Sequence, residues 1–149
     1  MTAERTSLLF VTIGRFHFAF PLADTLGACE AMIPANDSRE ESVSAYSTVF
    51  AGDDVPVFDL RRWFGDPTPA AGLAVILRNK DSHFGIVVQS VIEAVEPDRY
   101  RWFDAPAGMT TLSPGLICGW ADWEGVGAFV LNVAALEAEL MSAPFEAPT

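Results

Sequence analysis

Few side chains in this sequence can do chemistry, and they are scattered along it. His17 and His83 are the two histidines, and neither has a second metal ligand at a suitable interval. Asp53 and Asp54 together could bind a metal or serve as acid and base, but adjacent strand residues point to opposite faces. We therefore interpret the pair as a solvated turn. Cys118 lies in the apolar run LICGW, which is typical of an inert buried thiol.

Sequence motifs of the common catalytic sites are missing. The sequence contains no G-x-S-x-G nucleophile elbow, Walker loop, G-x-G-x-x-G loop or H-E-x-x-H motif. We predict no catalytic residue, no metal site and no cofactor, and we do not expect an enzyme.

The charge of the chain narrows the choice of partner. Twenty acidic and nine basic residues give a net charge of −11, which repels phosphate backbones and anionic lipid head groups. The run Arg99, Tyr100, Arg101 and Trp102 has the composition of a platform on which bases stack. Two arginines make a weak groove in so acidic a chain, so we expect a protein partner and no direct contact with nucleic acid.

Length and terminal composition predict one cytoplasmic domain. The 149 residues fit a single domain, which we place at residues 1–142, with a flexible tail at residues 143–149. The N-terminus lacks the apolar region of a signal peptide, and no apolar run is long enough for membrane insertion. Cys29 and Cys118 are too few for a disulfide framework and are expected to be buried free thiols.

Short apolar runs separated by turn residues predict a mostly β protein. Hairpins are expected at the Gly14-Arg15 turn, at the NKDSH turn and around Glu124-Gly125. The predicted strands cover residues 8–13, 16–20, 55–58, 73–78, 84–89, 91–95, 116–123 and 127–131.

The remaining segments read as turns, loops and one helix. The stretch after Pro21 fits a short helix leading into a strand, and DLRRWFG fits one helical turn. Residues 35–48 are polar without a clear period and predict a long exposed loop, and residues 97–115 predict a second irregular stretch. Asn132 is expected to cap a final helix whose apolar stripe comprises Val133, Leu136 and Leu140.

Four motifs in order along the chain resemble the CheW family, whose members couple bacterial chemoreceptors to the histidine kinase CheA. FVTIGRFHFAFPLADT resembles the opening strand, glycine turn and second strand of that family. VPVFDLRRWFG, residues 55–65, is similar to its V-P-V-x-D-L-R segment, and HFGIVVQSVIEAVEP, residues 83–97, to its G-I-x-V-D-x-V segment. LICGW and AFVLNVAALEAEL match the closing strands and terminal helix.

The resemblance implies two five-stranded SH3-like β-barrels around a shared hydrophobic core, with a short C-terminal helix. It also implies a non-catalytic adaptor that docks on the cytoplasmic tip of a methyl-accepting chemoreceptor and on the regulatory domain of a CheA-type kinase. Docking would use grooves near the junction of the barrels, where residues 55–58 would lie. By this resemblance the candidate partner-binding residues are Phe50, Asp53, Asp54 and Val55.

The sequence departs from the family pattern just before V-P-V, where an N-L-R-G segment is expected. Aligning Gly52 with that glycine places Ala51 at the position of the arginine, and Asp53 and Asp54 replace an aliphatic pair. Losing a cation and gaining two anions changes the local potential enough to reject a surface selected for the usual adaptor. The pattern suggests a diverged accessory member, such as the FrzB type of gliding myxobacteria, which either couples receptors to the kinase or competes for the kinase.

Two other classes of function stay open on sequence alone. One is a β-barrel that senses a small molecule, with Trp102, Trp120 and Trp123 lining its pocket. The other is an enzyme with an unfamiliar site, although few titratable groups fall in the apolar segments.

Overall fold

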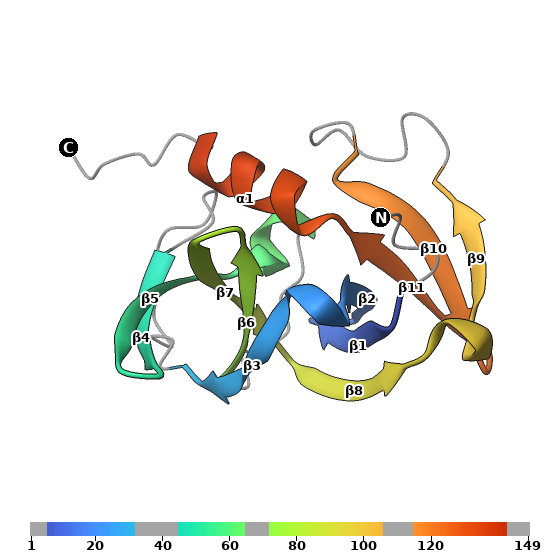
Figure 1. Ribbon diagram of the computed structural model, residues 1–149, viewed down its shortest axis with the longest axis horizontal. Coiled ribbons are helices and arrows are strands. Elements are labelled where there is room, and N and C mark those ends of the chain that lie inside the picture. Colours follow the sequence, from blue (N-terminus) through green and yellow to red (C-terminus); the bar gives the residue numbers. More distant parts are fainter. Residues whose placement is uncertain (1–5, 32–44, 65–71, 106–114, 143–149) are drawn as a thin grey trace.

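The structure is a computed structural model that describes residues 6–31, 45–64, 72–105 and 115–142. These ranges form strands, short 3-10 helices and one α-helix (Figure 1). In chain order the elements are β1 (Leu8–Ile13), β2 (Phe16–Pro21), η2 (Leu22–Asp24), β3 (Thr25–Glu30), β4 (Ala45–Phe50), β5 (Asp53–Phe58), η3 (Leu60–Phe64), β6 (Leu73–Asn79), β7 (Ser82–Val88), β8 (Ser90–Val95), η4 (Pro97–Arg99), β9 (Arg101–Asp104), β10 (Ile117–Trp123), β11 (Val126–Leu131) and α1 (Val133–Ser142).

The strands form two sheets, and the middle of the chain supplies all of one of them. The first sheet has the order β8-β1-β2-β11-β10-β9, and the second has the order β3-β6-β7-β5-β4. The chain therefore begins in the first sheet, builds the second, and returns to the first through β8. Figure 1 shows the two sheets at opposite ends of the molecule, with β8 running between them along one side.

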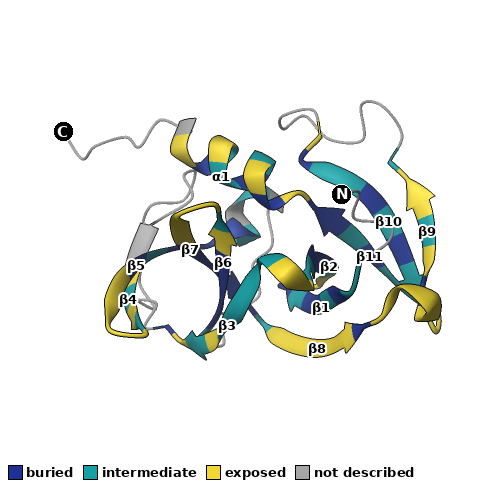
Figure 2. Ribbon diagram, viewed as in Figure 1, coloured by how far each residue is buried: buried dark blue, intermediate teal, exposed yellow. Residues whose placement is uncertain are grey.

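The predicted fold class is confirmed, with one difference in strand number. The described residues place six strands in the first sheet rather than five, because β8 follows β7 directly and pairs with β1. Where the chain leaves β7, the backbone N–H of Gln89 donates to the carbonyl oxygen of Thr12 at 2.7 Å. Figure 2 shows β8 exposed along most of its length.

A shared core lies between the two sheets because one face of several strands, among them β1, β5 and β7, is turned toward it. In β1 the odd-numbered residues Val11 and Ile13 belong to this core, and Leu8 and Phe10 face the interior of the first sheet. Side chains from β2, β6, β7, β11 and α1 complete the shared core. Burying this apolar surface is the main stabilising contribution that joins the two halves.

The interiors of the two halves differ in side-chain size. The interior of the first sheet contains aromatic rings, and Phe10 meets Trp123 edge to face with ring centroids 5.6 Å apart. The interior of the second sheet is lined by small side chains: Ala31, Val57, Ala74 and Val87. The second half therefore has a core of small side chains and lacks the aromatic rings found in the cluster of the first sheet.

The predicted hairpins are present, and so is the short helix that leads into a strand after Pro21. Two loop predictions are wrong in part. Residues 45–48 belong to β4, because every residue of this strand pairs with a residue of β5. Residues 97–104 form η4 and β9, because the β-prone Trp102 and Phe103 pair with β10. Residues 35–44 and 106–114 of these two predictions lie outside the described residues.

The final helix agrees with its prediction. The side-chain oxygen of Asn132 accepts a hydrogen bond from the backbone N–H of Ala135 at 2.9 Å, as an N-cap residue does. Val133, Leu136 and Leu140 are buried in the shared core. No helix within the described ranges is long and apolar enough to cross a bilayer. The predicted tail at 143–149 lies outside those ranges.

Candidate functional site

The four candidate partner-binding residues lie together on the hairpin of β4 and β5. Phe50 pairs with Asp53 across a two-residue turn made of Ala51 and Gly52. Both turn residues have positive φ, +52° at Ala51 and +87° at Gly52, as a turn joining twisted antiparallel strands requires. We call residues 49–54 the hairpin tip. The tip stands at the position where the family pattern predicts N-L-R-G.

Ala51 holds the hairpin tip in a conformation that its side chain disfavours. A residue with a Cβ atom in the left-handed region costs roughly 1–2 kcal/mol, and Asn, Asp or Gly is the usual choice there. Nothing lies within 4 Å of a Cβ atom built on Gly52, so this end of the turn faces open space. The fold therefore presents the tip to solvent.

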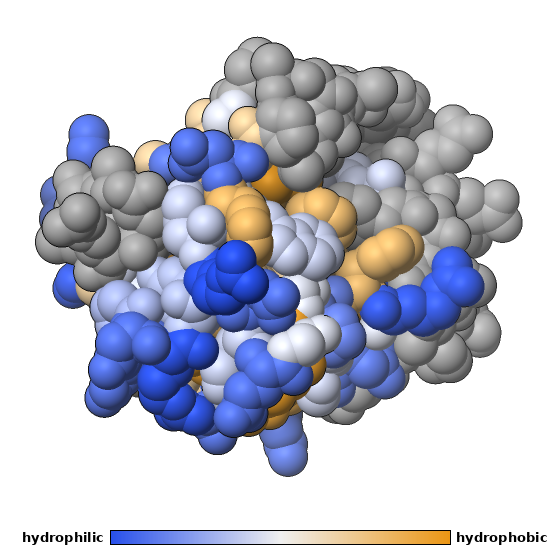
Figure 3. Space-filling model, turned by 90° about the vertical axis from the view of Figure 1, so that its right-hand side faces the viewer, coloured by the Kyte–Doolittle hydropathy of each residue, from blue (hydrophilic) through white to orange (hydrophobic). Residues whose placement is uncertain are grey.

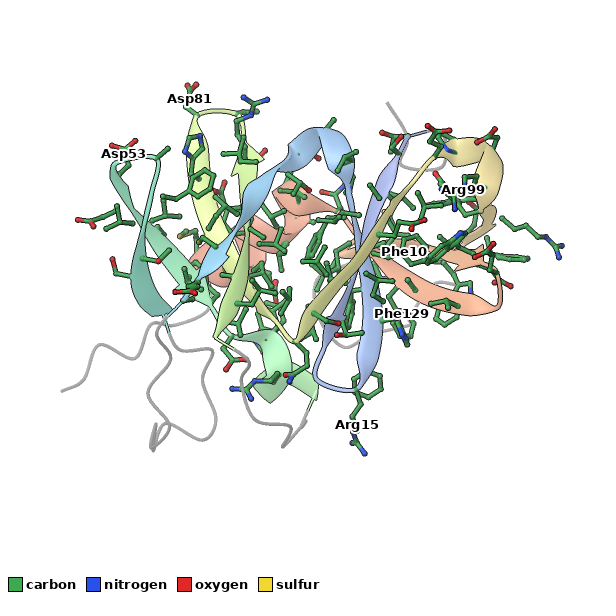
Figure 4. All side chains as sticks on the ribbon, turned by 90° about the horizontal axis from the view of Figure 1, so that it is seen from below. Phe10, Arg15, Asp53, Asp81, Arg99 and Phe129 are labelled. Atoms are coloured by element: carbon green, nitrogen blue, oxygen red, sulfur yellow. The ribbon has the colours of Figure 1, made fainter. Side chains whose placement is uncertain are left out.

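Two carboxylates stand on this tip without partners. Asp53 and Asp54 are exposed, and within the described part of the chain neither carboxylate has a hydrogen bond or an ion pair. Asp53 lies opposite Phe50 and Asp54 opposite Val49, so the two carboxylates leave opposite faces of the hairpin. Figure 4 shows Asp53 at the outer end of β5, far from Arg15 on the β1–β2 turn. The tip is a local concentration of negative charge rather than a metal site.

The large apolar side chains of the tip and of Val55, which follows it, divide into an exposed one and two that pack inward. Val49 is 65% exposed. Val55 is 2% exposed and takes no part in the surface. Phe50 is half-buried, and its ring lies over Gly27 of β3. Sequence reasoning placed these residues next to one another, but it did not identify Val49 as the exposed apolar side chain.

A buried ion pair fixes the chain just after β5, and sequence reasoning did not identify it. Asp59 is 2% exposed, and its Oδ1 accepts hydrogen bonds from Nε of Arg61 at 2.9 Å and from the backbone N–H of Arg61 at 3.1 Å. The guanidinium of Arg61 also donates to Oδ2. The intervening Leu60 is buried in the shared core. The D-x-R spacing was the available signal, but burial of the aspartate could not be known from it.

The segment from Arg99 to Trp102 is used inside the fold rather than as a stacking platform. The guanidinium of Arg99 lies 5.8 Å from the ring centroid of Trp123 and forms an ion pair with Glu93 at 3.0 Å. The hydroxyl of Tyr100 donates to the carbonyl oxygen of Thr6 at 2.7 Å. These side chains anchor η4 and β9 to the rest of the first sheet.

The three tryptophans of the sensor hypothesis do not line one pocket. Trp120 and Trp123 point to opposite faces of β10, because they are three positions apart and successive side chains of a strand alternate between its faces. Trp102 packs across Gly119 on the face of Trp123. Trp120 instead packs edge to face on Phe129, with centroids 4.8 Å apart. Figure 3 looks onto this end of the molecule and shows apolar side chains next to one another, with hydrophilic ones around them.

The other candidate residues lie apart. Among the described residues no group of three or more His, Cys, Asp and Glu side chains is placed to hold a metal ion. Cys29 and Cys118 are free thiols, half-buried rather than buried as predicted. Burial raises the pKa of the Cys118 thiol, which donates to the carbonyl oxygen of Val130 at 3.4 Å. Such a thiol is a poor nucleophile at neutral pH.

Comparison with known proteins places the chain in a family. A model of the CheW-like domain matches residues 7–140. The fold is similar to that of the scaffolding protein TtCheW from Thermoanaerobacter tengcongensis, with a TM-score of 0.65 and 15% sequence identity over 86% of this chain and 89% of that one. No curated protein matches the sequence. The structural likeness shows the fold, and the family model spans nearly all the described residues. The chain belongs to the CheW-like domain family.

Proposed function

We propose that this protein is a non-catalytic cytoplasmic adaptor of a bacterial chemosensory array. It docks on the cytoplasmic tips of methyl-accepting chemoreceptors, and its hairpin tip decides whether it couples them to a CheA-type histidine kinase or competes for that kinase. The observation that carries the proposal is the CheW-like domain match over residues 7–140. An adaptor of this kind works by raising the effective concentration of its partners and needs no reaction chemistry.

The hairpin tip supports the second part of the proposal. Where the family pattern has an arginine, this chain has Ala51, followed after one residue by the exposed Asp53 and Asp54. Charges at the rim of an interface act mainly on the association rate and on the choice of partner. A partner surface that accepts arginine carries negative charge, so it is repelled by two carboxylates. The kinase regulatory domain of an ordinary array is the partner this change would exclude.

The test compares binding of the intact protein to two purified partners. One is a receptor cytoplasmic tip, and the other is the CheW-like regulatory domain of the kinase. The double variant Asp53→Lys/Asp54→Lys reverses the charge of the tip. The matched control Asp98→Lys/Glu124→Lys makes the same charge change at exposed positions of η4 and of the β10–β11 turn, in the other half of the molecule.

We expect the native protein to bind the receptor tip and the double variant to associate about tenfold faster with the kinase domain. The control variant should change neither interaction by as much. Equal binding of the native protein and the double variant to both partners would contradict the assignment of the hairpin tip. Failure of the native protein to bind either partner would contradict the adaptor function itself.

A further inference from the structure

In the described part of the second sheet, β3 and β4 meet at a seam where no backbone pairing between them is found. Within the described strands, β3 pairs with β6 and β4 pairs with β5, so β3 and β4 are the two edges of their sheet. Two side chains bridge these edges. Thr48 donates its hydroxyl to the carbonyl oxygen of Glu30 at 3.2 Å, and the ring of Phe50 lies on Gly27. The seam is therefore held by side chains rather than by paired backbone groups.

The outer half of the β4–β5 hairpin depends on this seam for its position. β5 pairs with β7 at Val57 and Phe58, and with β4 along its whole length. Among the described strands, the segment from Asp53 to Pro56 therefore pairs with β4 alone, and β4 pairs with no strand other than β5. An antiparallel pair of strands is marginally stable by itself, so contacts across the seam decide where the hairpin tip lies.

The contact between Phe50 and Gly27 is a close fit. A Cβ atom at position 27 would lie 3.3 Å from Cζ and 3.4 Å from Cε1 of the Phe50 ring, tighter than most Cβ contacts. Phe50 lies opposite Asp53, on the same face as Val55 and Val57, and that face is turned to the interior of the second sheet. The ring therefore caps the end of an interior lined by small side chains.

We infer that Phe50 is a positioning residue rather than a partner contact. Its ring packs on Gly27 and holds the β4–β5 hairpin against β3, and we call this contact the latch. The latch fixes the direction in which Asp53 and Asp54 are presented. The consequence for docking rests on the proposed function. The latch itself is a property of the fold and can be tested without any partner.

The first test is amide hydrogen exchange of the intact protein. Phe50→Ala removes the ring, Gly27→Val places a side chain where the ring packs, and Phe50→Met keeps an apolar side chain long enough to reach Gly27, which the Phe50 ring meets through Cζ and Cε1. The matched control Val49→Ala truncates the exposed neighbouring side chain. We expect Phe50→Ala and Gly27→Val to raise the amide exchange rates of β4 and β5 about tenfold, because the hairpin opens locally, and to leave the rates of β1, β10 and β11 unchanged. The control and Phe50→Met should stay close to the native protein.

Two results of this test would overturn the latch. One is unchanged exchange of β4 and β5 in Phe50→Ala. The other is equally faster exchange in both sheets, which would mean general destabilisation. A nuclear Overhauser contact between the Phe50 ring and the Cα protons of Gly27 is also expected in the native protein, and its absence would contradict the geometry.

The second test uses whichever of the receptor tip and the kinase regulatory domain the native protein binds. Phe50→Ala should weaken that binding while its dependence on salt concentration persists, because both carboxylates remain. Asp53→Asn/Asp54→Asn should reduce the salt dependence and leave hydrogen exchange unchanged. If Phe50→Ala weakens binding without changing exchange, Phe50 is a direct contact and the inference is wrong. If the native protein binds neither partner, the proposed function fails, and the exchange data still decide the latch.

Discussion

Replacing Arg61 with methionine tests how far the chain after β5 depends on the Asp59–Arg61 pair. The variant leaves the Asp59 carboxylate 2% exposed, with the backbone N–H of residue 61 at 3.1 Å as its remaining donor among the contacts described above. Removing one partner of a buried ion pair costs about 3–5 kcal/mol, because the other charge stays buried and uncompensated. In a chain of this length that loss lowers Tm by about 6–20 °C.

The double variant Asp59→Asn/Arg61→Met separates the ion pair from other packing of the Arg61 side chain. The asparagine oxygen can still accept the backbone hydrogen bond, and no charge is left buried. We therefore expect the double variant to be more stable than Arg61→Met alone, which is the sign of a coupled pair in a double-mutant cycle. Unfolding in urea, followed by tryptophan fluorescence and circular dichroism, gives the free energy of unfolding of Arg61→Met and of the double variant. A loss below about 1 kcal/mol for Arg61→Met, within the range of exposed pairs, would refute the reasoning.

Three further predictions follow from single contacts. Asn132→Ala removes the cap of α1 and should cost about 1 kcal/mol of unfolding free energy in urea; no change would contradict the capping role. Gly119→Ala places a Cβ atom 2.2 Å from the Trp102 ring, so it should cost about 1–3 kcal/mol, and Trp102→Ala in the same chain should reduce that cost. Because burial raises the pKa of the Cys118 thiol, its thiolate forms at higher pH than usual. In a Cys29→Ser variant, labelling by a thiol reagent should keep accelerating with pH beyond the usual thiol range, and an early plateau would contradict this.

Much of the fold could be predicted because local patterns carry it. A nearly continuous apolar run defines β1, alternating phenylalanines define β2, and the cap at Asn132 with its buried stripe defines α1. β4 was missed because its first residues continue a polar run, and its pairing with β5 is what makes it a strand. β9 was missed because it follows Pro97 closely and is fixed by its pairing with β10. Pairing of distant segments is not visible in a single sequence.

The candidate site could be located by sequence, but the roles of its residues could not. Phe50, Asp53 and Asp54 are near neighbours in the chain, so any turn brings them together. Which of them faces solvent depends on the length of that turn and on the opposite strand. Phe50 packs on Gly27 of β3, and the sequence around Gly27 does not indicate this contact. Likewise the D-x-R spacing at residues 59–61 does not reveal that the aspartate is buried.

The most direct test of the adaptor function is titration calorimetry of the intact protein against a cognate receptor's cytoplasmic tip and against the regulatory domain of the kinase. We predict saturable binding to the receptor tip, with weak or no binding to the kinase domain until Asp53 and Asp54 are replaced by lysine. Absence of binding to both partners, for the native protein and for the lysine variant, would contradict the proposal that this CheW-like chain is a chemosensory adaptor.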